Sequence, residues 1–127
     1  MNFHFISDIH LEFCHYSLKQ HINKYNRRGV PENEEINLIL AGDIGYPSHE
    51  NTKQFFQQAS KLYDHVFMVI GNHEYYKSSF EDTSKTLTDI IKSFQNFHIL
   101  DNEMIKHGNV YIIGTTLWSF VEENSDA

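Results

Sequence analysis

The sequence predicts an α/β domain built on a mostly parallel β-sheet, with flanking helices and a C-terminal β-hairpin. Three short apolar runs each end in polar residues, and stretches with apolar residues at helical spacing follow the second and third of them. Strand–helix–strand order favours right-handed crossovers and therefore a parallel sheet. At 127 residues, of which 40% are hydrophobic, the chain is expected to form one domain over residues 1–127 around one core.

The first half of the chain is expected to contain two strands and one long helix. The first strand is an apolar run over residues 3–7, and the periodic pattern then lapses between residues 13 and 35, as in a loop or a short inserted helix. The second strand covers residues 36–41. Ser48 is the expected N-cap of the helix that follows. The buried face of this helix is expected to consist of Phe55, Phe56, Ala59, Leu62 and Tyr63.

The second half is expected to contain a strand, a helix, a short strand and a hairpin. The third strand covers residues 65–70, and the second helix covers residues 80–94. Ser79 begins a sequence that resembles a capping box at the start of this helix. A short strand over residues 97–100 precedes a β-hairpin over residues 104–113, which turns at a Gly-Asn pair.

Composition and charge argue against several kinds of protein. The formal net charge of -7 argues against sequence-independent binding to nucleic acid or to an anionic membrane, because clustered Lys and Arg carry such binding. No apolar run approaches the roughly 20 residues that span a bilayer. No cationic stretch precedes an apolar segment at the N-terminus either, so the expected location is cytoplasmic. The single cysteine, Cys14, cannot form an internal disulfide, which agrees with a reducing compartment. Four of the ten basic residues lie between residues 13 and 35, in a loop that is either solvated or contacts a substrate phosphate.

Candidate metal ligands follow each of the three apolar strands. Asp8 and His10 follow the first strand, and their spacing on an extended segment would place both side chains on the same side. Asp43 follows the second strand and has two oxygens that can bridge a pair of metal ions. Asn72 follows the third strand and offers a neutral amide oxygen. Since the carboxyl ends of parallel strands meet at one edge of a sheet, the sequence predicts a metal site at that edge.

The residues after Asn72 are candidates for supporting roles. His73 would stabilise charge on a phosphoryl oxygen or protonate a leaving group. Glu74 would hydrogen-bond a metal ligand or His73, and in this way fix the tautomer of the imidazole. His4 is expected to be packed or hydrogen-bonded within its strand. A further group of histidines is expected to be solvated: His15, His21, His49, His65 and His98.

These motifs resemble those of the calcineurin-like metallophosphoesterases. The similarity rests on Asp8 with His10, on Asp43 preceded by glycine, and on the Gly-Asn-His-Glu sequence at residues 71–74. The Gly-Thr-Thr-Leu-Trp stretch at residues 114–118 is similar to a later core stretch of some bacterial and viral members. The resemblance covers nearly the whole chain, and it implies hydrolysis of phosphomonoesters or phosphodiesters at a centre of two divalent metal ions. Mn, Fe, Zn, Ni and Co are all compatible with mixed carboxylate and imidazole ligands.

The resemblance also implies a role for each matching residue. Asp8 and His10 would bind the first ion, Asp43 would bridge both ions, Asn72 would bind the second, and His73 would be the catalytic histidine. The implied fold is an αββα sandwich of which this chain supplies the N-terminal part. The family completes its site with histidines from a Gly-His pair and a Gly-His-x-His turn, and this chain has no histidine after His107.

The missing histidines leave three explanations open. The chain is a fragment of a longer enzyme, a shortened relative kept as a binding or scaffold protein with at most one metal ion, or a protein that a second copy or a partner completes. A partner over the exposed face of the sheet is expected because an uncovered apolar patch favours association. The two functional hypotheses are thus a metal-dependent phosphoester hydrolase and a non-catalytic relative.

Overall fold

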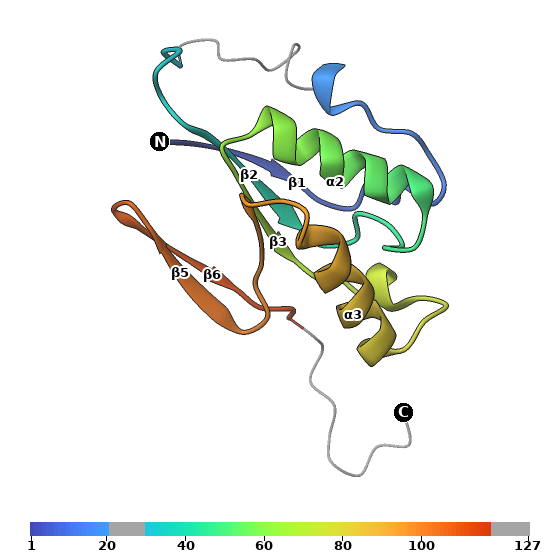
Figure 1. Ribbon diagram of the computed structural model, residues 1–127. Helices are drawn as coiled ribbons and strands as arrows, with labels where there is room; N and C mark the ends of the chain where they lie inside the picture. Colours follow the sequence, from blue (N-terminus) through green and yellow to red (C-terminus); the bar gives the residue numbers. More distant parts are fainter. Residues whose placement is uncertain (21–29, 118–127) are drawn as a thin grey trace.

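The computed structural model describes residues 1–20 and 30–117, and its centre is a parallel sheet of four strands (Figure 1). The strands lie side by side in the order β1 (Asn2–Ile6), β2 (Ile36–Ala41), β3 (His65–Val69) and β4 (Phe97–Ile99). All three neighbouring pairs are parallel. The four strands therefore end at one edge of the sheet, which we call the carboxyl edge, and begin at the opposite amino edge.

Two helices cover one face of this sheet (Figure 1). They are α2 (Glu50–Leu62) and α3 (Phe80–Ile91), and each packs buried apolar side chains against alternate residues of the strands. The period of two along a strand sends Leu38 and Leu40 to this face and the intervening Ile39 to the other. The larger core contains Ile6, Leu38, Leu40, Val66 and Met68 from the sheet, Phe55, Phe56 and Ala59 from α2, and Leu87 from α3.

The helix boundaries test two predicted caps. Ser79 caps α3 as predicted, since its Oγ accepts a hydrogen bond from the backbone N–H of Asp82 at 3.0 Å. The prediction of Ser48 as the cap of α2 is wrong by one residue: His49 is the N-cap, and its Nδ1 accepts from the backbone N–H of Asn51 at 3.2 Å. An imidazole nitrogen thus takes the place of the usual hydroxyl or carboxylate oxygen.

A two-stranded antiparallel hairpin lies against the other face of the sheet (Figure 1). Its strands are β5 (Glu103–His107) and β6 (Val110–Gly114), and Gly108 provides the left-handed backbone of the turn with a φ of 57°. A smaller core of Phe67, Leu100 and Ile112 joins the hairpin to the sheet. The predicted fold class is confirmed, with parallel strands, flanking helices and the C-terminal hairpin all present.

The hairpin covers only part of its face of the sheet. Phe5 of β1 remains 67% exposed, and several apolar side chains of the hairpin also face solvent in the described part of the chain. These are Met104, Val110, Tyr111 and Ile113. In the ranges that the structure describes, no helix combines the length and the apolar character needed to cross a membrane.

Candidate metal centre

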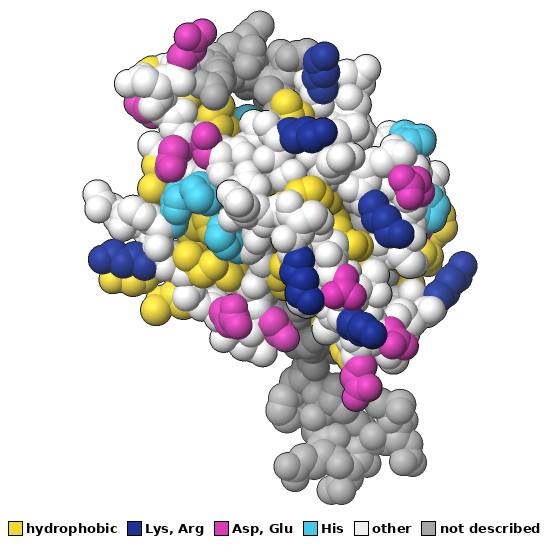
Figure 2. All heavy atoms as spheres, in the orientation of Figure 1, with side chains coloured by type: hydrophobic (Ala, Val, Ile, Leu, Met, Phe, Trp, Pro, Cys, Tyr) yellow, Lys and Arg dark blue, Asp and Glu magenta, His cyan; other side chains and the backbone are white. Residues whose placement is uncertain are grey.

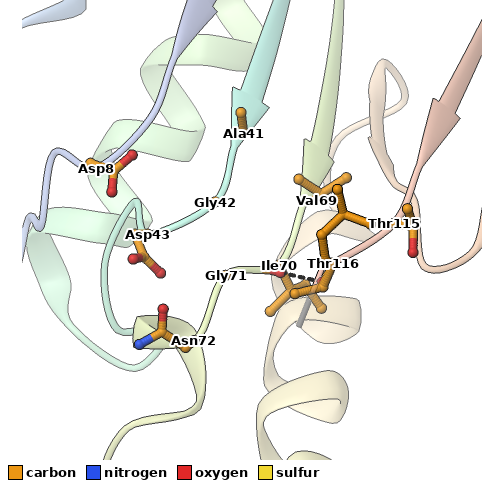
Figure 3. A pocket seen from close by; sticks show the side chains of 11 residues that line it. Asp8, Ala41, Gly42, Asp43, Val69, Ile70, Gly71, Asn72, Thr115 and Thr116 are labelled. Carbon is orange, nitrogen blue, oxygen red and sulfur yellow. Dashed lines mark hydrogen bonds between the residues drawn. The ribbon is translucent and has the colours of Figure 1, made fainter. Parts of the chain in front are cut away.

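An open pocket of about 400 Å³ lies at the carboxyl edge of the sheet (Figure 3). Residues that follow β1, β2, β3 and β6 line it, so four segments distant in the sequence meet there. The lining consists of Asp8, Ala41, Gly42, Asp43, Val69, Ile70, Gly71, Asn72, Thr115, Thr116 and Leu117. Thr116 is held by a hydrogen bond from its Oγ1 to the carbonyl oxygen of Ile70 (Figure 3).

Three of the predicted ligands converge beside this pocket. One ligand atom from each of Asp8, His10 and Asp43 lies within 4.8 Å of the other two. In Figure 3, Asp43 lies between Asp8 and Asn72, as a bridging carboxylate would. Backbone hydrogen bonds join the two loops that carry these residues, from the N–H of Asp8 to the carbonyl of Gly42 and from the N–H of His10 to the carbonyl of Asp43. The donor set of carboxylate and imidazole fits a divalent transition metal.

The local geometry of these ligands differs from the extended segment that the sequence predicted. Asp8, His10 and Asp43 have φ angles of 53°, 46° and 54°, in the left-handed region that residues with a Cβ atom rarely occupy. Asp8 and His10 therefore converge because the chain after β1 is left-handed at both residues, and not through the period of two of a strand. Such backbone conformations cost on the order of 1–3 kcal/mol each and cluster at functional sites.

The glycines next to the pocket allow the β2 and β3 loops to approach closely. A Cβ atom on Gly71 would overlap the Oδ1 and backbone nitrogen of Asp43. A Cβ atom on Gly42 would come within 3.1 Å of the Gly71 backbone, and Gly42 itself has a φ of 88°. Both positions therefore require glycine for the two loops to bring Asp43 and Asn72 together.

Asn72 offers its amide oxygen to the pocket. Its Nδ2 donates a hydrogen bond to the Tyr76 hydroxyl at 2.8 Å, and in Figure 3 its oxygen points toward Asp43. The amide is thus oriented with the oxygen available for a cation. The Tyr76 ring also lies against the His73 ring, with 4.4 Å between the ring centres.

His73 lies next to His10 and is held by two acidic residues. Its backbone N–H donates to Asp43 Oδ1 at 2.9 Å, and its Nδ1 lies 3.0 Å from Glu12 Oε1. Because an ionised carboxylate only accepts, His73 donates from Nδ1, which leaves its Nε2 to hold or transfer a proton. The His10 Nδ1 atom is 3.1 Å from the same nitrogen of His73, so the predicted ligand and the predicted catalytic residue are in direct contact.

Sequence reasoning missed Glu12, whose side chain is only 2% exposed. Its Oε1 faces both His73 and His10, while its buried Oε2 has no hydrogen-bond partner among the described residues. The available signal was the alternation of Asp8, His10 and Glu12 at every second position. The Oε1 atom of this buried carboxylate thus contacts both imidazoles, and ligand atoms of Glu12, His10 and His73 lie within 4.8 Å of one another.

Of the two predicted roles of Glu74, the hydrogen bond to a metal ligand is present, since Glu74 accepts from the backbone N–H of Asp43, whereas the His73 ring contacts Glu12 instead. Glu74 is fully buried, and its carboxylate accepts hydrogen bonds from the backbone N–H groups of Asp43, Ile44, Gly45 and Gly71, at 3.0, 2.6, 3.2 and 2.7 Å. Burial raises the pKa of this carboxyl, and the four backbone donors oppose the rise. Glu74 therefore joins the β2 loop to the β3 loop through their backbones, while Glu12 is the residue that contacts His73.

Part of the predicted surroundings lies outside the described residues. Lys24, Arg27 and Arg28 of the basic loop belong to residues 21–29, and Trp118 belongs to residues 118–127. The assignment of Asp8, His10, Asp43 and Asn72 as ligands and of His73 as the catalytic residue stays a prediction. The structure brings all five to one edge of the sheet.

Comparison with known proteins agrees with this arrangement. Residues 1–123 match the calcineurin-like phosphoesterases. Among curated proteins, the uncharacterized protein L509 of Acanthamoeba polyphaga mimivirus is 35% identical over 126 residues, which make up 94% of this chain and 45% of that protein. The chain thus spans about half the length of the curated relative it matches. No solved structure is significantly similar to it. The chain belongs to the calcineurin-like phosphoesterase family, whose activity at the family level is the metal-dependent hydrolysis of phosphoesters.

Proposed function

We propose that this chain carries the N-terminal ligands of a two-metal centre that hydrolyses phosphomonoesters or phosphodiesters. The observation that carries the proposal is the convergence of Asp8, His10 and Asp43 within 4.8 Å of one another at the carboxyl edge. Asn72 lines the same pocket and His73 contacts His10, so the candidate ligands and the candidate acid lie together. Membership of the phosphoesterase family supports the reaction class.

Each residue has a role that its surroundings support. Asp8 and His10 would hold the first ion, Asp43 would contact both ions, and Asn72 would hold the second through its amide oxygen. When bound, divalent ions at such a centre neutralise phosphoryl charge and activate water. Mn, Fe, Zn, Ni and Co all suit this donor set.

His73 would act on the substrate itself. Its Nδ1 is occupied by Glu12 at 3.0 Å, so the proton that it can give or accept is the one at Nε2. In this role it would protonate the leaving oxygen or donate a hydrogen bond to a phosphoryl oxygen. Glu12 would act only through His73, by holding the ring in one tautomer and orientation.

Ligands from outside the described residues would complete the second ion's shell, to which Asp43 and Asn72 alone contribute here. The exposed apolar side chains of the hairpin and Phe5 favour a covering partner, either a second copy of the chain or another polypeptide. The competing proposal is a non-catalytic relative that keeps the fold and at most one ion. The strained backbone at three candidate ligands favours the catalytic proposal, because such strain is concentrated at working sites.

Phosphoesterase assays with added Mn²⁺ separate the two proposals. The chain would be assayed with an aryl phosphate and a bis-aryl phosphate, beside Asp43→Asn, His73→Asn and the control His15→Asn, which changes an exposed histidine. We expect Asp43→Asn to lose both metal binding and turnover, and His73→Asn to lose turnover while it retains the metal. If the parent hydrolyses neither ester and Asp43→Asn binds Mn²⁺ as the parent does, the catalytic proposal is wrong.

A further inference from the structure

A glutamate and two histidines form a second group of candidate metal ligands, at the amino edge of the sheet. It consists of Glu35 just before β2, His65 at the start of β3, and His107 at the end of β5. One ligand atom from each lies within 4.8 Å of the other two. Glu35 Oε2 is 3.1 Å from His107 Nε2, and Glu35 Oε1 is 4.0 Å from His65 Nε2. The prediction that His65 is a solvated histidine is wrong, since only 33% of its side chain is exposed and its ring contacts three other residues of the sheet and hairpin.

His98 of β4 extends the group on the side away from Glu35. Its Nε2 lies 3.5 Å from His65 Nδ1, so it contacts the one ring nitrogen of His65 that does not face the carboxylate. Both rings pack near the ring of Phe67, which is 1% exposed. Phe67 also lies beside the His107 ring, with 5.5 Å between the ring centres. The three imidazole rings therefore all pack against the buried ring of Phe67, which fixes their positions.

This group is separate from the candidate metal centre. His65 begins β3, whereas Gly71 and Asn72 follow its end, so six residues of extended chain, or roughly 20 Å, separate the two edges. No residue of the group lines the pocket at the carboxyl edge. On the face of the molecule that Figure 2 draws, histidine side chains lie beside acidic ones.

We propose that Glu35, His65 and His107 form a binding site for Zn²⁺ or a similar transition-metal ion. Two imidazoles and one carboxylate are a ligand set that zinc takes in proteins. With zinc–ligand distances of about 2.0–2.2 Å, tetrahedral ligand atoms lie about 3.4 Å apart. The three ligand atoms now lie within 4.8 Å of one another, so the widest pair would move closer by at most about 1.4 Å. Glu35 is the exposed and adjustable member, since its side chain is 43% exposed.

His98 has the position of an orienting partner in this site. A histidine that binds metal through Nε2 carries its hydrogen on Nδ1 and donates it to a neighbouring acceptor. His65 Nδ1 has such an acceptor in His98 Nε2 at 3.5 Å. The bound ion would join β3 and the loop before β2 to the end of β5, and would hold the hairpin against the sheet. This inference does not depend on the proposed phosphoesterase activity.

The test measures zinc binding with the carboxyl edge disabled. In the full chain carrying His10→Asn and Asp43→Asn, which breaks both ligand groups at the carboxyl edge, we expect calorimetry to find one zinc ion per chain. Adding His107→Asn should weaken binding at least about 100-fold, and adding His98→Asn about 10-fold to 100-fold, as for lost outer partners of metal ligands. The matched control, His15→Asn, should bind as its parent does. Zinc binding that is unchanged by His107→Asn would overturn the proposal.

A second measurement on the unaltered chain guards against variants that fail to fold. NMR of the histidine rings during a zinc titration should show the resonances of His65 and His107 moving together, with slower amide exchange over β5 and β6. If zinc shifts only His10 and His73 and leaves His65 and His107 unchanged, the amino-edge group is merely hydrogen-bonded and the proposal is wrong.

Discussion

The two edges of the parallel sheet assemble their polar side chains by different means. At the carboxyl edge the candidate ligands sit on loops whose backbones are left-handed at Asp8, His10 and Asp43, and a buried carboxylate holds two of those loops together. At the amino edge the side chains come from strands, the hairpin and the residue just before β2, and the histidines meet because of strand register and packing against Phe67. A site built by the backbone leaves a local sequence motif, whereas a site built by packing does not.

The largest expected effect comes from removing the hydrogen bonds between the Glu74 carboxylate and the backbone of the carboxyl-edge loops. Glu74→Gln replaces one acceptor oxygen by an N–H₂ group that faces backbone donors, so we expect the free energy of unfolding to fall by about 3 kcal/mol. Urea denaturation measures this change. The control Glu81→Gln, at an exposed position of α3, should change stability by no more than about 0.5 kcal/mol. Equal effects for the two variants would contradict the role assigned to Glu74.

The contact between Glu12 and His73 provides the next test. Glu12→Gln removes the charge that orients His73, and we expect kcat to fall about 10-fold to 100-fold with little change in KM. Steady-state kinetics on an aryl phosphate with Mn²⁺ measures both values. A variant that changes KM alone, or that loses its metal, would show that Glu12 serves binding and not the orientation of His73.

Two glycines test whether the two edges of the sheet are independent. Gly71 lies at the carboxyl edge, and Gly108 follows His107 at the amino edge. Gly71→Ala places a methyl group against Asp43 and should weaken Mn²⁺ binding about tenfold. Gly108→Ala at the hairpin turn meets only the end of the Met1 side chain, but its φ of 57° disfavours alanine, so it should destabilise the hairpin by about 1 kcal/mol. Calorimetry should show that Gly108→Ala leaves Mn²⁺ binding unchanged. A loss of Mn²⁺ binding in both variants would mean that the edges are coupled.

The smallest expected effect is a change in how the free energy of unfolding depends on pH, and it comes from His4, which belongs to neither site. Burial lowers the pKa of His4 in β1, whose ring hydrogen-bonds the hydroxyl of Tyr63 at the end of α2 at 2.9 Å. The unfolded chain takes up a proton near pH 6.5 and the folded chain does so at lower pH, so this group makes stability fall as pH drops below about 6.5. His4→Gln should flatten the stability profile over that range, as urea denaturation at several pH values would show. An unchanged profile would contradict this assignment.

Sequence alone could predict most of the fold because the periodic patterns matched the elements. The strands end within a residue or two of their expected bounds, and the hairpin turns at Gly108 as its sequence indicates. The cap of α2 was missed because histidine is a rare N-cap. Its ring nitrogen accepts the hydrogen bond from a backbone N–H that a hydroxyl oxygen usually accepts.

Only those residues of the candidate site that belong to the recognisable motifs after the strands could be predicted from the sequence. Asp8, His10 and Asp43 follow strands, and topology was enough to bring them to one edge. The tasks of Glu12 and Glu74 could not be told apart, because each depends on which buried atoms a carboxylate faces after folding. His65, His98 and His107 lie far apart in the sequence and meet through the register of β3 with β4 and the docking of the hairpin.

The left-handed backbone at Asp8, His10 and Asp43 also affects how this protein responds to engineering. Each position carries a conformation that glycine adopts without penalty, so a screen that rewards thermal stability would favour glycine at the very positions that supply the ligands. Alanine scanning would combine loss of the ligand with continued backbone strain, because alanine retains the Cβ atom. Asparagine keeps the shape of aspartate and tolerates this backbone, so it isolates the contribution of the charge.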